Sequence, residues 1–309
     1  HESLTGLSVR YPQATMVMET GTHSPWVSRL FTKLGHTVYV ANARKVRAIS
    51  QSTTKSDVED ARMLARLGRA DPKLLSPIQH RSEAGQRALL RLKVRDTLVR
   101  SRVNQMNSVR CLLKSLGLPV PSGSKAMTFT RKLRPMFDAN TCALVEPLLT
   151  LIDALNAQIK ALDDQLDTLA REQYPATERL RQIDGVGPLT ALAFVLTLED
   201  PARFPHTRDV GAYLGLVPRR DQSGNTDKQL PITKAGNVHL RCLLVNCAHY
   251  ILGPFGPPSL LREHGLRLAA RGGKSAKKRA VIATARKLAV TLLALWKTGA
   301  DYHALPQAA

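Results

Sequence analysis

The sequence predicts a small α/β unit followed by a mainly α-helical remainder. Short β-prone runs at 15–19 and 37–41 flank a helical stretch from Trp26 to Leu34, which is a βαβ pattern. Two long segments with helical apolar spacing follow, separated by a link that contains prolines. We therefore expect three domains, at residues 1–80, 81–175 and 176–309.

The βαβ pattern places a carboxylate at the end of its first strand. Glu19 closes this run, and functional groups of such units lie at the carboxyl ends of strands. Asp57 and Asp60 open a predicted helix, where a three-residue spacing puts them on one face. Clustered carboxylates repel one another and recruit a divalent cation, and all-oxygen ligands favour Mg²⁺ or Mn²⁺. We expect these three acids to be metal ligands, although each taken singly is equally explained as a surface side chain.

Two long helices follow the α/β unit. Residues 82–116 predict a basic helix with an apolar stripe, and a second helix begins beyond the link. Its apolar residues alternate at intervals of four and three, as in a heptad seam. The predicted seam consists of Leu148, Ile152, Leu155, Ile159, Leu162, Leu166 and Leu169. The pattern indicates an antiparallel coiled-coil arm or a dimerising stalk, and core-facing helices of one globular domain are the alternative.

The C-terminal third predicts a mostly helical domain with a helix-hairpin-helix-like element. Between Ile183 and Ala191 the glycines Gly185 and Gly187 have the spacing of that motif, in which bare amides at a helix start meet a phosphate. An ordinary glycine-rich helix connection is the alternative. The predicted nucleic-acid contacts are Gly185, Gly187, Arg219, Arg220, Lys234, Arg241, Lys277, Lys278 and Arg279. The lysines and arginines among them are also explained as a solvated face.

The charge balance points to a polyanionic partner. The chain has 45 Lys and Arg against 24 Asp and Glu, a formal net charge of +21. Nucleic acid is the leading partner, and its binding should be strongly salt-dependent. Aromatic residues make up 5% of the chain, which favours phosphate contacts over a broad surface for stacking bases.

Cysteine usage and hydropathy fit an intracellular protein. The four cysteines are scattered without a CxxC pair, so neither a zinc site nor a disulfide framework is predicted. No apolar run approaches the roughly 20 residues of a membrane helix, and the first residues lack the plan of a signal peptide. We expect a cytoplasmic protein without a membrane partner.

Ser223 is the candidate nucleophile. It precedes a glycine and follows Arg219 and Arg220, which could hold a phosphate for attack by the hydroxyl. A loop hydroxyl without a chemical role is the alternative on spacing alone. The chain has no GxSxG elbow, so a Ser-His-Asp hydrolase has no support.

Several motifs in a fixed order resemble the IS110/IS1111 family of transposases. They are Met18–Gly21, Lys55–Ala61, Ile183–Gly187, Tyr213–Pro218, Gln222–Gly224 and Ile232–Asn237. The resemblance implies a RuvC-like domain of ribonuclease H type with an Asp-Glu-Asp-Asp metal site, a coiled-coil arm and a C-terminal domain with a catalytic serine. Glu19, Asp57 and Asp60 match the last three acids, and Ser223 matches the serine. It also implies DNA strand exchange directed by an element-encoded guide RNA.

The chain departs from this pattern at the first aspartate. No Asp precedes Glu19, and the chain begins at His1 without a methionine. We therefore expect a truncated transposase that lacks the first strands and has an incomplete metal site. The alternatives are a catalytically dead nucleic-acid-binding remnant and a RuvC-like junction nuclease that uses metal-activated water. Because recombination holds two DNA partners together, we also expect a homo-oligomer, a dimer or a tetramer.

Overall fold

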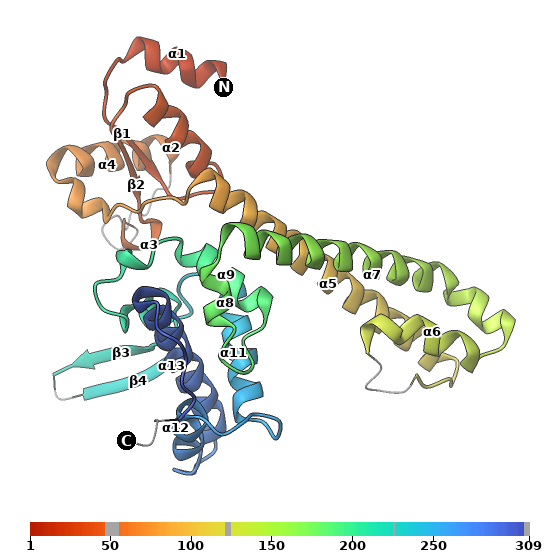
Figure 1. Ribbon diagram of the computed structural model, residues 1–309. Coiled ribbons are helices and arrows are strands. Elements are labelled where there is room, and N and C mark those ends of the chain that lie inside the picture. The colour runs from red at the N-terminus through yellow and green to blue at the C-terminus, as the bar shows by residue number, and fades with distance from the viewer. Residues whose placement is uncertain (47–55, 121–124, 225, 306–309) are drawn as a thin grey trace. The chain divides into compact units, whose positions relative to one another are not determined.

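The structure is a computed structural model that describes residues 1–46, 56–120, 125–224 and 226–305. Its contacts divide the chain into two compact units, 1–83 and 84–309 (Figure 1). The first division falls close to the predicted boundary after residue 80. The predicted boundary after residue 175 lies inside the second unit and stays a prediction.

The first unit contains the predicted βαβ element. Strand β1 pairs with β2 in parallel, from Met16 opposite Val38 to Glu19 opposite Ala41, and α2 connects them. Ile78 adds an antiparallel bridge to Val40 of β2. The elements are α1 (Glu2–Arg10), β1 (Met16–Glu19), α2 (Ser24–Lys33), β2 (Val38–Ala41), α3 (Ala43–Val46), α4 (Asp57–Ala70) and η1 (Pro72–Leu75).

A glycine lets α4 pack closely on this small sheet. A Cβ on Gly68 would lie 2.7 Å from Cγ2 of Val17 in β1, so a larger residue would push the helix away. Ala41, Val46 and Leu75 form the buried core beside this contact. The contact point is near the end of α4, far along the helix from its acidic first turn.

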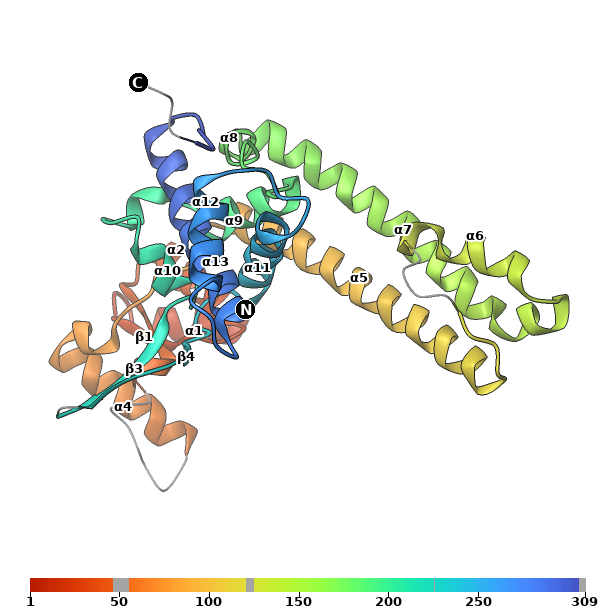
Figure 2. The same cartoon turned by 90° about the horizontal axis from the view of Figure 1, so that it is seen from below.

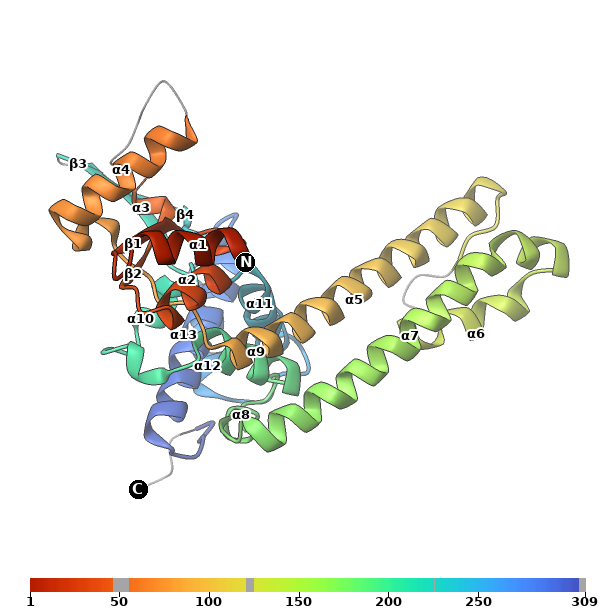
Figure 3. The same ribbon diagram turned by 90° about the horizontal axis from the view of Figure 1, so that it is seen from above.

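The second unit is almost entirely helical apart from one hairpin. Its elements are α5 (Glu83–Ser115), η2 (Ala126–Thr128), α6 (Phe129–Leu133), η3 (Arg134–Met136), α7 (Ala139–Gln173), α8 (Ala176–Leu180), α9 (Pro188–Leu198), η4 (Pro201–Arg203), α10 (Asp209–Tyr213), β3 (Pro218–Ser223), β4 (Thr226–Ile232), α11 (Val238–Leu252), α12 (Leu260–Ala269) and α13 (Ala276–Thr298). The long helices α5 and α7 run side by side in all three ribbon views (Figures 1, 2 and 3).

Two polar contacts fix the register of α5 against α7. The guanidinium of Arg95 donates to both carboxylate oxygens of Asp163, at 2.7 and 3.2 Å, and Arg102 donates to Oδ1 of Asn156 at 2.9 Å. Residue numbers rise along α5 while those of the partners fall along α7, so the two helices are antiparallel. We call these two contacts the polar layers of the arm.

Four of the seven positions predicted for the α7 seam are buried, namely Ile152, Ile159, Leu166 and Leu169. Leu148, Leu155 and Leu162 are only partly buried, which contradicts their predicted place in the seam. The other buried positions are Val145, Leu149, Asn156 and Ala170, and the partly buried Asp163 reaches α5 through Arg95. The cause is the polar layers, because they bring Asn156 and Asp163 into the seam, where a search for apolar residues selects the leucines beside them.

By length and composition α7 is the one helix among the described residues that could cross a membrane. The inward-facing side chains of α7 are instead packed against other parts of the protein. Val145, Leu149 and Ile152 pack with Phe129 and Leu133 of α6 in a buried cluster at the far end of the arm.

The largest core surrounds α9. Every side chain from Thr190 to Leu198 is buried, as expected for a helix that is apolar on all sides. Helices α11 and α13 supply more of the surrounding residues than any other helices, and the near ends of α5 and α7 join the same cluster. The arm is therefore anchored in the C-terminal core.

We predict that Asn156→Ala destabilises the second unit by about 1–3 kcal/mol, because it leaves buried donors of Arg102 without an acceptor. Nε of Arg102 already has no partner among the described residues. Urea unfolding followed by circular dichroism measures the loss. Gln158→Ala, at an exposed position two residues along α7, is the matched control. Equal stability of the two variants would contradict a structural role for this polar layer.

Candidate functional site

The hairpin of β3 and β4 carries Ser223 at its tip. The strands are antiparallel, with Gln222 opposite Asp227 and Ser223 opposite Thr226. Ser223 is exposed, and Gly224 follows it with a φ of +54°, in the left-handed region. The hydroxyl group is therefore accessible to a large substrate and does not lie in apolar packing.

Two glycines hold the base of this hairpin together. A Cβ on Gly215 would lie 2.2 Å from the backbone N of Ala235, and one on Gly236 would lie 2.1 Å from the carbonyl O of Tyr213. Both glycines also have positive φ, at +66° and +69°. Only glycine allows the chain entering β3 and the chain leaving β4 to approach this closely.

A buried guanidinium joins the same two segments. Nη1 of Arg241, on α11, donates to the carbonyl oxygens of Leu214 at 3.0 Å and Ala235 at 2.6 Å. Arg241 is 8% exposed. This burial argues against the predicted contact of Arg241 with nucleic acid, because its donors already bind the backbone. We call Gly215, Gly236 and Arg241 the hairpin clamp.

The other basic residues near Ser223 are exposed. Arg220 forms a bidentate ion pair with Asp227 across the hairpin, at 3.0 and 2.9 Å, so a phosphate would have to share or displace that carboxylate. Arg219 and Lys234 are exposed at the base of the hairpin, where the chain enters β3 and leaves β4. Lys234 has a φ of +54°, an uncommon conformation for a residue with a side chain.

The structure does not gather the predicted metal ligands. Glu19 is exposed at the end of β1, and Asp57 and Asp60 lie in the first turn of α4. Gly68, where α4 touches β1, is eight residues beyond Asp60, or about 12 Å along the helix axis. Within the described part of the chain no three His, Cys, Asp or Glu residues form a metal-binding group. The carboxylates Glu19, Asp57 and Asp60 therefore do not form a metal site in this structure. Lys55, the first residue of the predicted Lys55–Ala61 motif, lies outside the described residues.

The acids of α4 have a local explanation as well. Asp57, Glu59 and Asp60 all fall in the first turn, where the positive end of the helix dipole favours negative charge. Glu59 also pairs with Arg62, and both side chains are largely exposed.

The glycine turn before α9 has the features of a phosphate contact. Gly187 is the N-cap of α9, no side chain caps the helix, and a Cβ on Gly187 would meet nothing within 4 Å. Pro188 at the first helical position has no N–H, so the uncapped amides of the residues after it are the ones available to an anion. Gly185 has a φ of +88° and lies against the ring of Tyr250, so it shapes the turn.

Helix α13 begins with three exposed cations. Lys277, Lys278 and Arg279 occupy its first turn, which contains no acid, and the N-cap Ser275 makes no side-chain cap. Cations at this end oppose the helix dipole at a cost of about 0.3–1 kcal/mol each, and a bound anion would offset that cost. Burial, followed by Lys287 and Arg267, lowers the pKa of His264 on α12. These charges make this surface strongly positive.

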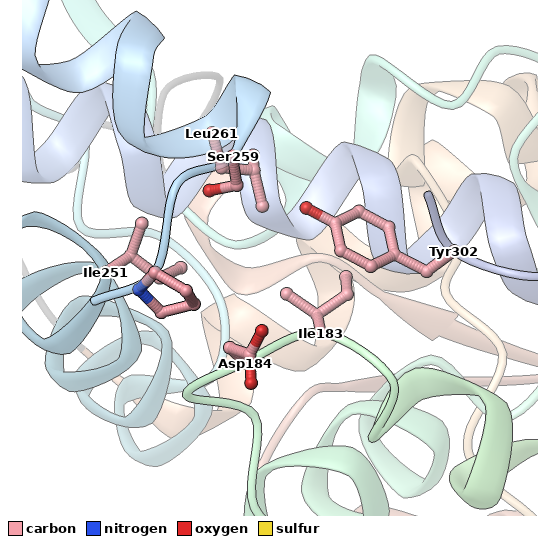
Figure 4. Close-up of a pocket in the computed structure, with 7 residues that line it drawn as sticks. Ile183, Asp184, Ile251, Ser259, Leu261 and Tyr302 are labelled. Carbon is pink, nitrogen blue, oxygen red and sulfur yellow. The ribbon is translucent and has the colours of Figure 1, made fainter. Parts of the chain in front are cut away.

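A small cavity lies behind the glycine turn (Figure 4). Its volume of about 10 Å³ has room for one water molecule at most. Tyr302 lies across it from Asp184, and burial raises the pKa of the phenol, which also hydrogen-bonds Ser259. The residues that line the cavity join the C-terminal segment, through Tyr302, to the glycine turn. The cavity itself is too small for a substrate.

An accessible hydroxyl on a clamped hairpin, with open helix starts and exposed cations in the same unit, is the arrangement of a protein that meets a polyanion. Two family models match the chain. One is the transposase IS116/IS110/IS902 family, over residues 177–259, and the other is the DEDD transposase of IS110, over residues 5–117.

Individual relatives agree with the family models. The transposase of IS1111A from Coxiella burnetii is 30% identical over 77% of this chain and 65% of its own length. The transposase of IS1328 from Yersinia enterocolitica is 29% identical over 79% and 73%, and a pilin gene-inverting protein of Moraxella bovis is 26% identical over 88% and 76%. The chain thus spans about two thirds of the IS1111A transposase. It belongs to the IS110/IS1111 family of transposases.

We predict that Gly236→Ala destabilises the second unit by about 1–3 kcal/mol, because the added Cβ would collide with Tyr213 O and φ would remain positive. Thermal melting measures the effect. Gly187→Ala is the matched control, since its Cβ meets nothing and its φ is −80°. A melting temperature for Gly236→Ala that equals the control's would show that the close approach is not required.

Proposed function

We propose that this chain is an insertion-sequence transposase that cleaves and rejoins DNA through Ser223. The observation that carries the proposal is the exposed Ser223 at the tip of a hairpin whose base is clamped. Membership of a transposase family supports it.

The proposed chemistry is a transesterification at Ser223. Its Oγ attacks the phosphorus of a phosphodiester, one P–O bond to deoxyribose breaks, and the leaving oxygen takes up a proton. The product is a phosphoserine link to one DNA end, which the hydroxyl of another strand resolves by the reverse reaction. The number of phosphoester bonds is conserved, so no external energy source is needed. In this proposal Arg219, which is exposed near the start of β3, stabilises charge on the transferring phosphoryl group.

DNA is held, in this proposal, by backbone and side-chain donors away from the hairpin. The open start of α9 at Gly187 and the cations in the first turn of α13 contact phosphates. The helix-hairpin-helix-like role of the glycine turn belongs to the same proposal, although α8 before it is a single turn of five residues.

Further features of the proposal come from family resemblance. They are a RuvC-like fold for the first unit, a coiled-coil role for α5 and α7, a homo-oligomeric assembly and an element-encoded guide RNA. The DEDD family model also suggests dependence on a divalent metal such as Mg²⁺. Because the described acids do not form a metal group, we assign no step of the reaction to that ion.

A second candidate is a nucleic-acid-binding protein without catalytic activity. The lack of a three-residue acidic group among the described residues favours it, because a metal-assisted nuclease needs its acids together. The basic surfaces would be unchanged. Salt-sensitive DNA binding without any covalent product would support this candidate.

We predict that Ser223→Ala abolishes a covalent protein–DNA adduct formed with DNA that bears the ends of the chain's own element and with the element's transcripts. The adduct is detected by its retarded migration in a denaturing gel. Ser108→Ala on the arm, another exposed serine, is the control and should form the adduct normally. If Ser223→Ala forms the adduct or recombines DNA as well as the parent, Ser223 is not the nucleophile. Cleavage to 5′-phosphate products in that variant would instead indicate a junction nuclease.

We predict that the triple variant Lys277→Ala, Lys278→Ala and Arg279→Ala binds duplex DNA more weakly and with less dependence on salt. The slope of log affinity against log salt concentration should fall by about 2–3, one for each lost phosphate contact. Fluorescence anisotropy over a range of salt concentrations measures it. Lys160→Ala, exposed on α7, is the control. An unchanged slope would place the phosphate contacts elsewhere.

A further inference from the structure

The loop between α11 and α12 holds one exposed aromatic ring. Within Gly253–Pro258, Phe255 is the only residue other than glycine and proline, and it is 82% exposed. We propose that Phe255 stacks on an unpaired base of the DNA during strand exchange. The inference rests on the proposed function, because it names the state of the DNA that the chain binds.

The loop is built to hold this ring in place. Its three prolines fix their φ angles. A Cβ on Gly256 would lie 2.2 Å from the carbonyl O of Ile251, so the loop folds tightly onto the last turn of α11. Arg262 donates to the carbonyl oxygens of Ile251 and Gly253, each at 2.6 Å. Because the loop backbone is already held by these contacts, binding of a ligand to the ring costs the loop little conformational entropy.

Exposure alone would not carry the inference, since single exposed apolar side chains are common. The rigidity of the loop is the distinguishing feature. A disordered loop could fold its phenyl ring onto nearby apolar surface, whereas this backbone presents the ring to solvent. The arrangement resembles the apolar wedges that insert beside bases in DNA-bending proteins.

The surroundings of the loop select a nucleic acid as the occupant. Gly253 lines an open cavity of about 420 Å³ together with Lys277 and Lys278 of α13. Ile251 and Pro257 line the small cavity behind the glycine turn, and Tyr250 contacts Gly185. The ring therefore projects from a loop that adjoins both candidate phosphate contacts. In a nucleic-acid strand each base has a phosphate on either side. An aromatic ring next to candidate phosphate contacts is the complementary arrangement.

An unpaired base is a better match than a paired one. Inside a duplex both faces of a base are already stacked, so a ring gains little unless it opens a step. Strand exchange passes through unpaired bases, and the ring would stabilise them without reading their sequence, because every base has an aromatic face.

The test compares a matched DNA duplex with the same duplex containing a short mismatched bubble. Affinities are measured by fluorescence anisotropy at one salt concentration. The parent chain should prefer the bubble, and Phe255→Ala should lose about fivefold to tenfold of that preference while duplex affinity stays the same. Phe255→Trp should retain the preference. Leu260→Ala, a nearby exposed aliphatic residue, is the control and should also retain it.

A loop variant tests the role of rigidity. Pro254→Gly with Pro258→Gly keeps the ring but frees the backbone, and we expect a partial loss of bubble preference with an unchanged circular dichroism spectrum. Equal bubble preference in the parent and Phe255→Ala would overturn the inference. The Ser223 adduct assay decides the proposed function separately, because the anisotropy measurement does not require cleavage.

Discussion

The position of Ser223 depends on the hairpin clamp. A two-stranded hairpin with every residue of β3 exposed has almost no core of its own, and such hairpins are marginal in isolation. The Arg241 guanidinium and the close approach at Gly215 and Gly236 tie both ends of the hairpin to α11 and the buried C-terminal core. The buried groups therefore hold the base of the hairpin, while Ser223 at the other end of β3 is exposed.

The arm shows how polar groups can organise an apolar contact. The Arg95–Asp163 and Arg102–Asn156 contacts lie between the cluster shared with the C-terminal core and the separate cluster around α6. A slip of one turn would leave these charged and amide groups unpaired, and buried polar groups are costly without partners. Register is thus set by the polar layers, while the two apolar clusters supply most of the stabilisation.

Periodicity predicted those parts of the fold in which burial alternates regularly. The βαβ unit and both long helices follow from it, with ends close to those observed. It could not place Asn156 in the α7 seam, because this polar side chain is buried there with its partner Arg102 on α5. The hairpin was missed because Pro218–Ser223 is polar throughout, with no alternation to detect. The sequence alone predicts Arg241 to be a surface cation, because its acceptors Leu214 O and Ala235 O come from segments distant in the chain. Composition likewise disfavours a broad surface for stacking bases, and the stacking that we propose involves a single ring, Phe255.

The separate cluster around Phe129 has a consequence for how such chains diversify. Because the outer end of α5 and α7 carries its own apolar packing, joined to the remainder only through two helices, its loops can be lengthened, shortened or exchanged without disturbing the hairpin. The outer end of the arm is thus a separate packing unit at the end of a long helix pair, in which the 33 residues of α5 span about 50 Å. Related chains could therefore differ at this outer end while the rest of the unit keeps its packing.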